Sequence, residues 1–332
     1  MIVSFDTICC MNWNLTEFSL SMTGVQKLAF IQQLIGKLEG LQFSRPVPKL
    51  REKNRARSIW GSTGIEGNRC SVEQVEAIVR GETVALSQKE QLEIRNALEA
   101  YAALPEFDPF SVDSFLNAHK KLMGNGLELA PGIFRRDPVE VYITETETRA
   151  MPPWETVEPS MRALFDYLKT SEELMLIKSI RFHFECVNIH PFFDGNGRTA
   201  RLWQTRLLML EHPVFEFLDV ESMVFEQREE YYRQIRLAQE SGKADGFVEF
   251  MLEQIRRSLS NLWESSAKSS GGYADRLAAA KQSLGADFSR QEYLKLFKTI
   301  SAPTASRDLA AGVADGLLVR KGDKRTTVYR FV

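Results

Sequence analysis

The strongest constraint on the fold lies near position 190, where a helical pattern ends and a loop containing glycine follows. Apolar residues three or four positions apart predict one buried helix face over residues 173–187, formed by Ile177, Ile180, Phe184 and Val187. Pro191 disfavours helical backbone at His190, so the helix is expected to end there. We therefore expect His190 at the point where a rigid helix passes into a loop.

The loop after Pro191 has the composition of an anion-binding turn. Gly195 and Gly197 flank Asn196, and glycine takes positive φ at little cost, which allows successive backbone N–H groups to point at one anion. A new helix is predicted to begin near Arg198, and its positive N-terminus would face the same place. Arg198 and Arg201 are three residues apart and so lie on one face of its first turn. Together these features predict a polyphosphate site.

Two further side chains of this segment predict group-transfer chemistry. Asp194 offers a hard oxygen, and one carboxylate with phosphate oxygens and water is the usual way a protein holds Mg²⁺. His190 is the strong base of the segment and is neutral near pH 7. Such a base takes the proton from an attacking hydroxyl, an effect of about 10²–10⁴ in rate. The alternative is a structural helix–loop–helix whose histidine and arginines only cap and pair.

Residues 190–201, His-Pro-Phe-Phe-Asp-Gly-Asn-Gly-Arg-Thr-Ala-Arg, resemble the signature HPFxDGNGRxxR of the Fic family at every position. The resemblance implies a mainly α-helical Fic fold and transfer of AMP from ATP to a Ser, Thr or Tyr hydroxyl of a target protein, which includes the chain itself. It implies that His190 is the catalytic base and that Asp194 holds the metal, Mg²⁺ or Mn²⁺. The residues it implies for the phosphates of ATP are Gly195, Asn196, Gly197, Arg198 and Arg201. Other phosphate-containing donors, and removal of AMP, stay open.

A short alternating pattern upstream predicts a β-hairpin in an otherwise helical region. Gly132-Ile133-Phe134-Arg135 precedes the alternating apolar positions Val139, Val141 and Ile143. This segment resembles the Fic flap, a hairpin at the mouth of the site whose free edge would hold a target peptide by strand addition. The alternative is an ordinary structural hairpin.

A second short motif lies far upstream of the first. Residues 62–68 match the inhibitory motif of the family, (S/T)xxxE(G/N), with Ser62, Glu66 and Gly67 at its fixed positions. By this resemblance, the Glu66 carboxylate enters the site of the γ-phosphate, pairs with Arg201 and competes with ATP. We therefore expect an enzyme that carries its own inhibitor.

Some aromatic and imidazole side chains have roles that the sequence leaves open. Tyr231 and Tyr232 resemble a tyrosine pair that follows the Fic core, and one of them would line the pocket of the nucleobase. Core packing explains at least one of the two equally well. His119 and His183 are assigned to the core or its edge.

The tail of the chain differs in charge from the rest. Residues 287–332 hold nine Lys or Arg against five Asp or Glu, a net charge of +4 on a chain whose total is −2. A capping box at Ser289, two helices and two strands resemble a winged helix-turn-helix. In a DNA-binding interpretation, the candidate contacts are Ser306, Arg307, Lys321, Lys324 and Arg325. The alternative, a docking or dimerisation module, carries equal weight.

These patterns predict four parts: an N-terminal helical region (1–110), a Fic core (111–264), a linker rich in Ser and Gly (265–272) and a winged-helix domain (273–332). The chain of 332 residues has 44% apolar and 26% charged residues, with no apolar run long enough to span a bilayer. No signal-like start and no metal-binding cysteine spacing occur, so we expect a cytoplasmic protein with reduced thiols. The oligomeric state stays open, a homodimer included. The first hypothesis is therefore an autoinhibited AMP transferase; the second is a DNA-binding regulator whose Fic domain senses nucleotide or modifies itself.

Overall fold

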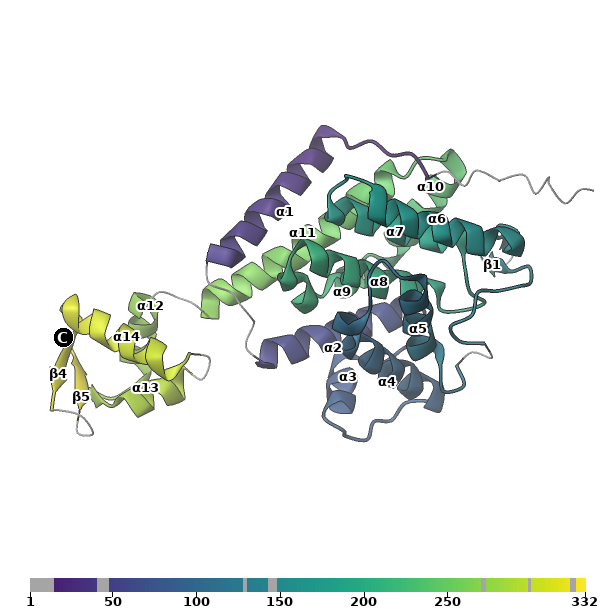
Figure 1. The fold of residues 1–332 in the computed structure, drawn as a ribbon. Helices are drawn as coiled ribbons and strands as arrows, with labels where there is room; N and C mark the ends of the chain where they lie inside the picture. The colour runs from purple at the N-terminus through teal and green to yellow at the C-terminus, as the bar shows by residue number, and fades with distance from the viewer. Residues whose placement is uncertain are drawn as a thin grey trace, which may run out of the picture. The chain divides into compact units, whose positions relative to one another are not determined.

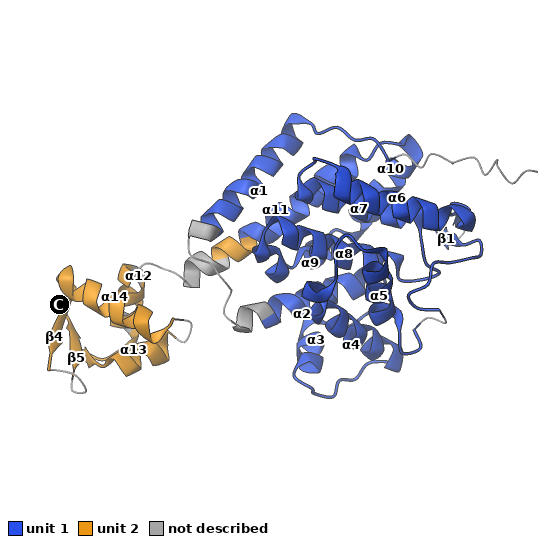
Figure 2. Cartoon of the chain, in the orientation of Figure 1, with its two compact units in different colours: residues 1–260 blue, residues 261–332 orange. Residues whose placement is uncertain are grey.

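The computed structural model describes residues 15–40, 48–127, 130–142, 148–269, 273–297, 300–322 and 327–332. The chain divides into two compact units, Met1–Ser260 and Asn261–Val332 (Figures 1 and 2). Both are mainly helical with small antiparallel sheets, as the sequence predicts. In the described part of the chain, no helix is long and apolar enough to cross a membrane.

The first unit holds eleven labelled α-helices and one hairpin within its described residues. Its helices are α1 (Met22–Gly40), α2 (Pro48–Ile65), α3 (Val72–Val79), α4 (Gln88–Ala102), α5 (Val112–Met123), α6 (Val157–Thr170), α7 (Met175–Ile189), α8 (Asn196–Glu211), α9 (Val220–Glu226), α10 (Arg228–Ser241) and α11 (Asp245–Ser269), with short 3-10 turns at Leu104–Glu106, Trp154–Thr156 and Pro213–Phe217. Its strands are β1 (Glu140–Tyr142) and β2 (Thr148–Ala150), which pair antiparallel with Val141 opposite Arg149.

The helix before the signature is buried on more sides than the sequence predicts. Helix α7 buries the expected Ile177, Ile180 and Phe184, but also the polar Ser179 and His183. A helix covered all round lies at the centre of a unit, not on its surface. One of the four predicted positions, Val187, is only half-buried and lines the cavity described below.

An aromatic cluster holds the start of the signature loop against this central helix. Phe192 belongs to it through Phe115, whose ring also contacts Phe165, Phe182 and Trp203. The ring centroids of these pairs lie 5.3 to 5.8 Å apart, the separation that aromatic pairs prefer. Phe192 is fully buried, so the loop that follows it starts from a rigid point.

Helix α2 carries the motif of residues 62–68 at its C-terminal end. It continues to Ile65, directly before Glu66. At Gly61 it passes so close to α9 that an added Cβ would lie 2.5 Å from backbone atoms of Glu221 and Ser222. The docking of α2 on α9 thus requires glycine at this position.

We expect Gly61→Ala to destabilise the protein by about 1–3 kcal/mol, because the methyl group meets immovable backbone. The matched control is Gly36→Ala in α1, where an added Cβ meets nothing within 4 Å. There, alanine should stabilise the helix by about 0.5–1 kcal/mol. Melting temperatures of the two variants check this, and a gain of stability in both would contradict the close packing of α2 on α9.

The second unit contains the predicted pattern of two helices and two strands, with one more helix and one more strand before it. Its elements are α12 (Tyr273–Ser283), β3 (Asp287–Phe288), α13 (Arg290–Leu296), α14 (Ala302–Ala314), β4 (Leu318–Lys321) and β5 (Val328–Phe331), and its sheet has the order β3-β5-β4. The capping box of Ser289 and Glu292 is present. Helix α14 begins at Ala302, after the N-cap Ser301. Its resemblance to a winged helix stays a prediction.

The structure places the first five residues of the predicted linker (265–272) in a helix. Residues 265–269 belong to α11, which continues through the boundary between the two units. Serine and glycine indicated a flexible segment, but Ala267 and Lys268 favour helix, and an existing helix adds residues at little cost. Residues 270–272 lie outside the described residues.

Candidate active site

His190 lies at the C-terminal end of α7 in a conformation that is unusual for a residue with a side chain. Its backbone is left-handed, with φ 54° and ψ 63°, and its N–H donates to the carbonyl of Cys186 at 3.0 Å. Such a conformation persists only where surrounding contacts hold it. The predicted end of the helix before Pro191 is confirmed, with the histidine as its cap.

The surroundings of the His190 ring keep it neutral. Burial lowers its pKa to about 4, and the Arg135 charge acts in the same direction, while Glu66 and Asp194 oppose it. A neutral ring nitrogen can accept a proton, as a general base must.

We expect the acid limb of kcat/KM to lie at or below pH 4 in a Glu66→Gly variant, because the rate falls only as the His190 ring becomes protonated and the Glu66 charge, which raises the pKa of this ring, is absent. A solvated histidine would place this limb near pH 6.5. The profile of a Glu66→Gly variant would be measured with ATP and a protein acceptor. A limb at pH 6.5 would mean that the ring is solvated in the working enzyme.

Arg135 holds the backbone around His190. Its guanidinium, 1% exposed, donates to the carbonyl of His190 at 2.7 Å and to that of Pro152, beside the hairpin, at 2.6 Å. Weaker contacts reach the carbonyls of Asp137 and Ile189. From the sequence, Arg135 was noted only as a residue at the start of the hairpin. Its hydrogen bonds to the backbone at His190 and Pro152 were missed, because any residue can supply a backbone carbonyl and the sequence therefore gives no sign of it.

Arg135→Lys is expected to lower kcat by about 10–100-fold. The single ammonium group of lysine cannot bind the carbonyls of His190 and Pro152 at the same time, so the His190 ring would lose its alignment. Affinity for ATP should change little. Arg136→Lys is the matched control, because Arg136 is exposed and next in sequence. Equal losses in both variants would exclude a specific role for Arg135.

The two glycines of the loop serve different purposes, which corrects the expectation that both take positive φ. Gly195 does so, at 78°. Gly197 lies in the first turn of α8, where an added Cβ would lie 2.5 Å from Oε1 of Glu66. Between them the Asn196 side chain donates to and accepts from the backbone of Phe192, both at 2.9 Å. The loop is therefore tied to the core.

His119 and His183 are buried, as the sequence predicts, and both support the site. His119 accepts from the N–H of Gly132 at 2.8 Å through Nδ1, so Nε2 carries the proton and donates to the carbonyl of Asp194 at 3.0 Å. It also stacks on Phe192. Burial lowers the pKa of His183 to about 3, which keeps that ring neutral.

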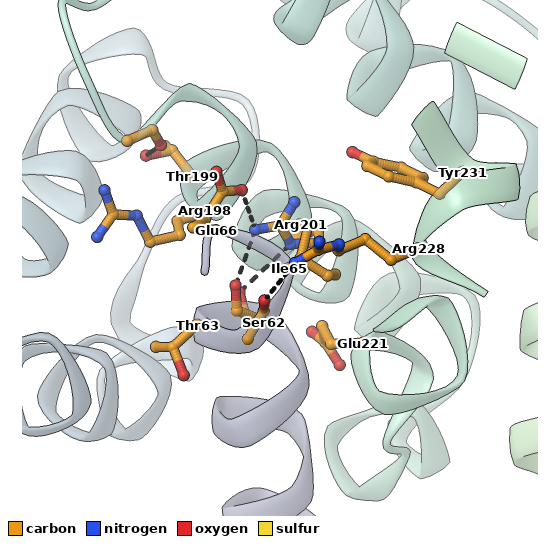
Figure 3. Close-up of polar contacts among 12 residues, drawn as sticks. Ser62, Thr63, Ile65, Glu66, Arg198, Thr199, Arg201, Glu221, Arg228 and Tyr231 are labelled. Atoms are coloured by element: carbon orange, nitrogen blue, oxygen red, sulfur yellow. Dashed lines mark hydrogen bonds and ion pairs between the residues drawn. The ribbon is translucent and has the colours of Figure 1, made fainter. Parts of the chain in front are cut away.

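Glu66 and Arg201 form a close ion pair across the site (Figure 3). The Arg201 Nη2 lies 2.6 Å from Oε1 of Glu66 and 3.0 Å from the carbonyl oxygen of Ser62. Burial of Arg201 lowers its pKa, but the charge and hydrogen bond of Glu66, together with Tyr231 and Tyr232, raise it above the usual value. Gly67, which follows with φ 97°, ends the motif. The predicted pairing of Glu66 with Arg201 is thus present.

Arg198 is held by two carboxylates instead of pointing freely into the site. Its guanidinium lies 3.1 Å from Asp194 and 3.5 Å from Glu93, which the sequence did not single out. Asp194 remains 60% exposed. Among the described residues, no group of three or more His, Cys, Asp or Glu could hold a metal. The prediction that Asp194 holds Mg²⁺ together with phosphate oxygens stays a prediction.

A cavity of about 420 Å³ brings most of the predicted residues together. It is lined by Glu66, Val141, Tyr142, Met151, Val187, His190, Asn196, Gly197, Arg201, Tyr231, Tyr232, Ile235, Arg236 and Gln239. This size is ordinary for a small-molecule site. Asp194, Gly195 and Arg198 lie outside this lining, and Arg236 and Gln239 are members that sequence reasoning missed.

The two tyrosines on α10 differ in their surroundings. Tyr231 is buried, and its hydroxyl lies 2.9 Å from Nε2 of His183. Tyr232 is 37% exposed and donates to the carbonyl of Ile65, at the end of α2, at 3.2 Å. Of the two, Tyr232 is therefore the ring with a face free for a ligand.

The remaining predicted site residues lie at surfaces or outside the described residues. In the hairpin, Val139 lies just before β1 and Val141 within it, whereas Ile143 is not among the described residues. In the second unit, Arg307 and Lys321 are exposed, and Ser306 accepts from Arg290 at 3.0 Å. Lys324 and Arg325 fall outside the described residues.

Comparison with known proteins agrees with this geometry. Residues 109–208 match the Fic/DOC family. The protein adenylyltransferase Fic of Nematostella vectensis is 27% identical over 250 residues, which cover 69% of this chain and 55% of that protein. Protein adenylyltransferase fic-1 of Caenorhabditis elegans is 27% identical over 70% of this chain and 46% of its own length. The chain thus spans about half the length of these relatives.

Two solved structures extend the comparison to the fold. The crystal structure of a Fic family protein from Desulfovibrio desulfuricans G20 is 30% identical, with a TM-score of 0.72, over 96% of this chain and 98% of that one. The structure of C. elegans Fic-1 (residues 134–508) is 22% identical, with a TM-score of 0.60, over 74% of this chain and 73% of that one, and shows the shared fold alone. The chain therefore belongs to the Fic family.

Proposed function

We propose that this chain is a protein adenylyltransferase, which moves AMP from ATP to a Ser, Thr or Tyr hydroxyl of a protein, and that Glu66 holds it at low activity. The observation that carries the proposal is that one cavity contains the neutral His190, the start of α8 at Gly197 and the ion pair of Arg201 with Glu66. The names of the adenylyltransferase relatives support the same reaction.

In this reaction His190 accepts the proton of the attacking hydroxyl, and the hydroxyl oxygen forms a bond to the α-phosphorus of ATP. The bond from that phosphorus to the bridging oxygen breaks, and pyrophosphate leaves. The N–H groups at the start of α8 and its dipole stabilise the phosphates. The exposed Asp194 carboxylate fits Mg²⁺ or Mn²⁺, which would neutralise phosphate charge when bound.

Glu66 is proposed to inhibit by occupying the place of a phosphate. Its carboxylate already satisfies Arg201, the buried cation that we assign to the terminal phosphate of ATP. It also lies against Gly197: a Cβ added to that residue would be 2.5 Å from Oε1 of Glu66. The carboxylate therefore fills the space at the start of α8. ATP can bind productively only after this carboxylate withdraws.

The hairpin is proposed to present the target. Strand β1 is one of only two strands in its sheet, so one of its edges is open to another strand within the described residues. Tyr142 on β1 is 81% exposed and yet belongs to the cavity lining. An extended peptide added along this edge would bring a hydroxyl toward His190 through backbone hydrogen bonds, with little demand on its sequence.

The test uses ATP labelled at the α- or the γ-phosphate, with wild type and Glu66→Gly, and reads label on the chain itself and on lysate proteins. Strong labelling from the α-position alone, by Glu66→Gly, is the expected result. Label from the γ-position would indicate phosphoryl transfer instead. Loss of label from a modified protein on incubation with wild type would indicate removal of AMP.

A second candidate function, DNA binding, rests on the net charge of +4 in residues 287–332 and on the exposed Arg307 and Lys321. Fluorescence anisotropy of the full chain with duplex DNA at rising salt tests it. Binding that weakens with salt, and is reduced by Arg307→Glu, is expected if this unit contacts phosphates. Absence of binding at low salt would leave the docking interpretation.

A further inference from the structure

The buried side chains of Arg201, Gln204 and Glu221 line one small cavity, and each carries a polar atom without a partner within the described residues. Arg201 Nη1, Gln204 Nε2 and Glu221 Oε2 are buried and have no hydrogen-bond partner within the part of the chain that the structure describes. All three side chains, each at most 3% exposed, line one cavity of about 10 Å³. Its other walls are mostly apolar side chains of α8, α9 and α11. Buried polar groups of native proteins rarely lack partners, so this convergence indicates a ligand.

The other polar atoms of the same groups are already paired, which leaves each group one position for that ligand. Gln204 Oε1 accepts from Nδ1 of His183 at 2.6 Å. Glu221 Oε1 accepts from the hydroxyls of Tyr101 at 2.8 Å and Thr205 at 2.9 Å. The Nη2 and Nε of Arg201 donate to Glu66 and to Ser62.

Size and chemistry narrow the ligand to one water molecule. A cavity of about 10–15 Å³ holds one water, which needs two to four polar partners. A cation is excluded by the two N–H donors of Arg201 and Gln204, and an anion by the carboxylate of Glu221. Burial raises the pKa of Glu221. The water satisfies all three atoms only while this carboxylate is ionised, because it then accepts from both N–H groups and donates to Glu221 Oε2.

We infer that a water molecule buried between Arg201, Gln204 and Glu221 makes Glu221 a second carboxylate partner of Arg201, and so a positioning residue for nucleotide binding. Glu66 follows the end of α2 and Glu221 lies on helix α9, so the two carboxylates come from different elements; Figure 3 shows the contact of Glu66 with Arg201. This inference rests on the proposed function, in which Glu66 withdraws when ATP binds. Glu221 then remains, so that the buried cation keeps a counter-charge and its orientation toward the phosphate.

The first test is a high-resolution crystal structure of the full wild-type chain, which needs neither a variant nor activity. We expect a water within about 2.7–3.2 Å of all three atoms. Direct contact between these side chains, or a cavity without density, would overturn the inference.

The second test measures ATP affinity by calorimetry in the Glu66→Gly background, where the phosphate site is free. Glu221→Gln keeps the shape of the side chain but removes its charge, and should weaken ATP binding about tenfold, with a smaller change in kcat at saturating ATP. Glu226→Gln is the matched control, because Glu226 ends the same helix and pairs at the surface with Arg57 and Arg257. Unchanged affinity in Glu221→Gln would overturn the inference.

The two proposals fail in different ways. If no variant transfers label although ATP binds, the proposed function is wrong. The role of Glu221 is then still decided by the crystal structure and by the ATP affinity of Glu221→Gln relative to its parent. If Glu66→Gly transfers AMP and Glu221→Gln binds ATP equally well, the transferase stands and the positioning role does not. Melting temperatures identify any variant that has lost its fold.

Discussion

Replacing Glu66 with glycine is expected to raise the rate of AMP transfer about 10–100-fold. The carboxylate makes a charge-assisted contact of 2.6 Å with the buried Arg201, and hydrogen bonds to charged groups contribute about 1.5–3 kcal/mol. Each 1.4 kcal/mol corresponds to a factor of ten in the population that is open to ATP. The Glu66 side chain is 31% exposed, which keeps the expected gain below that of a fully buried pair. Initial rates with ATP labelled at the α-phosphate measure it.

The matched control for this gain is Glu82→Gly. Glu82 also pairs with an arginine at 2.6 Å, but that pair with Arg80 is about half-exposed at the surface. Loss of a surface pair changes stability by about 0–1 kcal/mol and should leave the rate unchanged. An unchanged rate in Glu66→Gly, with ATP binding intact, would show that Glu66 does not inhibit. A fall in rate would suggest that the carboxylate takes part in the chemistry.

His190→Ala in the Glu66→Gly background is expected to lower the rate of transfer by about 10²–10⁴-fold, the usual contribution of a general base. ATP affinity should be nearly unchanged, because the phosphates are assigned to α8 and to the arginines. Label transfer and calorimetry on the same preparation separate the two effects.

The control for His190→Ala is His212→Ala. His212 lies at the C-terminal end of α8, outside the cavity lining, and its side chain caps the following 3-10 turn. It should cost some stability and no catalytic rate. Full transfer by His190→Ala would mean that another group, or water, takes the proton. Loss of ATP binding in that variant would mean that His190 holds the nucleotide instead of the proton.

Most of what lies close together in the sequence could be predicted from it. The end of α7 before Pro191, the start of α8 near Arg198 and the capping boxes at the helix N-termini follow from backbone preferences of a few neighbouring residues. The signature at residues 190–201 holds the residues predicted as base, phosphate loop and metal ligand within twelve residues, so this prediction needed no tertiary information. The same holds for the motif around Glu66, whose contact with Arg201 was predicted from family resemblance and is present.

The partners that come from distant parts of the chain became visible only in the folded structure. Arg135 acts on the carbonyls of other segments, Glu93 contacts Arg198, and Glu221 lines the same small cavity as Arg201, each from a part of the chain far away in sequence. The spacing of apolar residues in the sequence indicates which face of a helix is buried. It does not indicate which buried polar side chains contact each other. That pairing depends on side-chain geometry at helix crossings, such as the contact of α2 with α9 at Gly61. For the same reason, burial of α7 on nearly every side was decided by its neighbours, because a helix has a solvent face only where nothing packs against it.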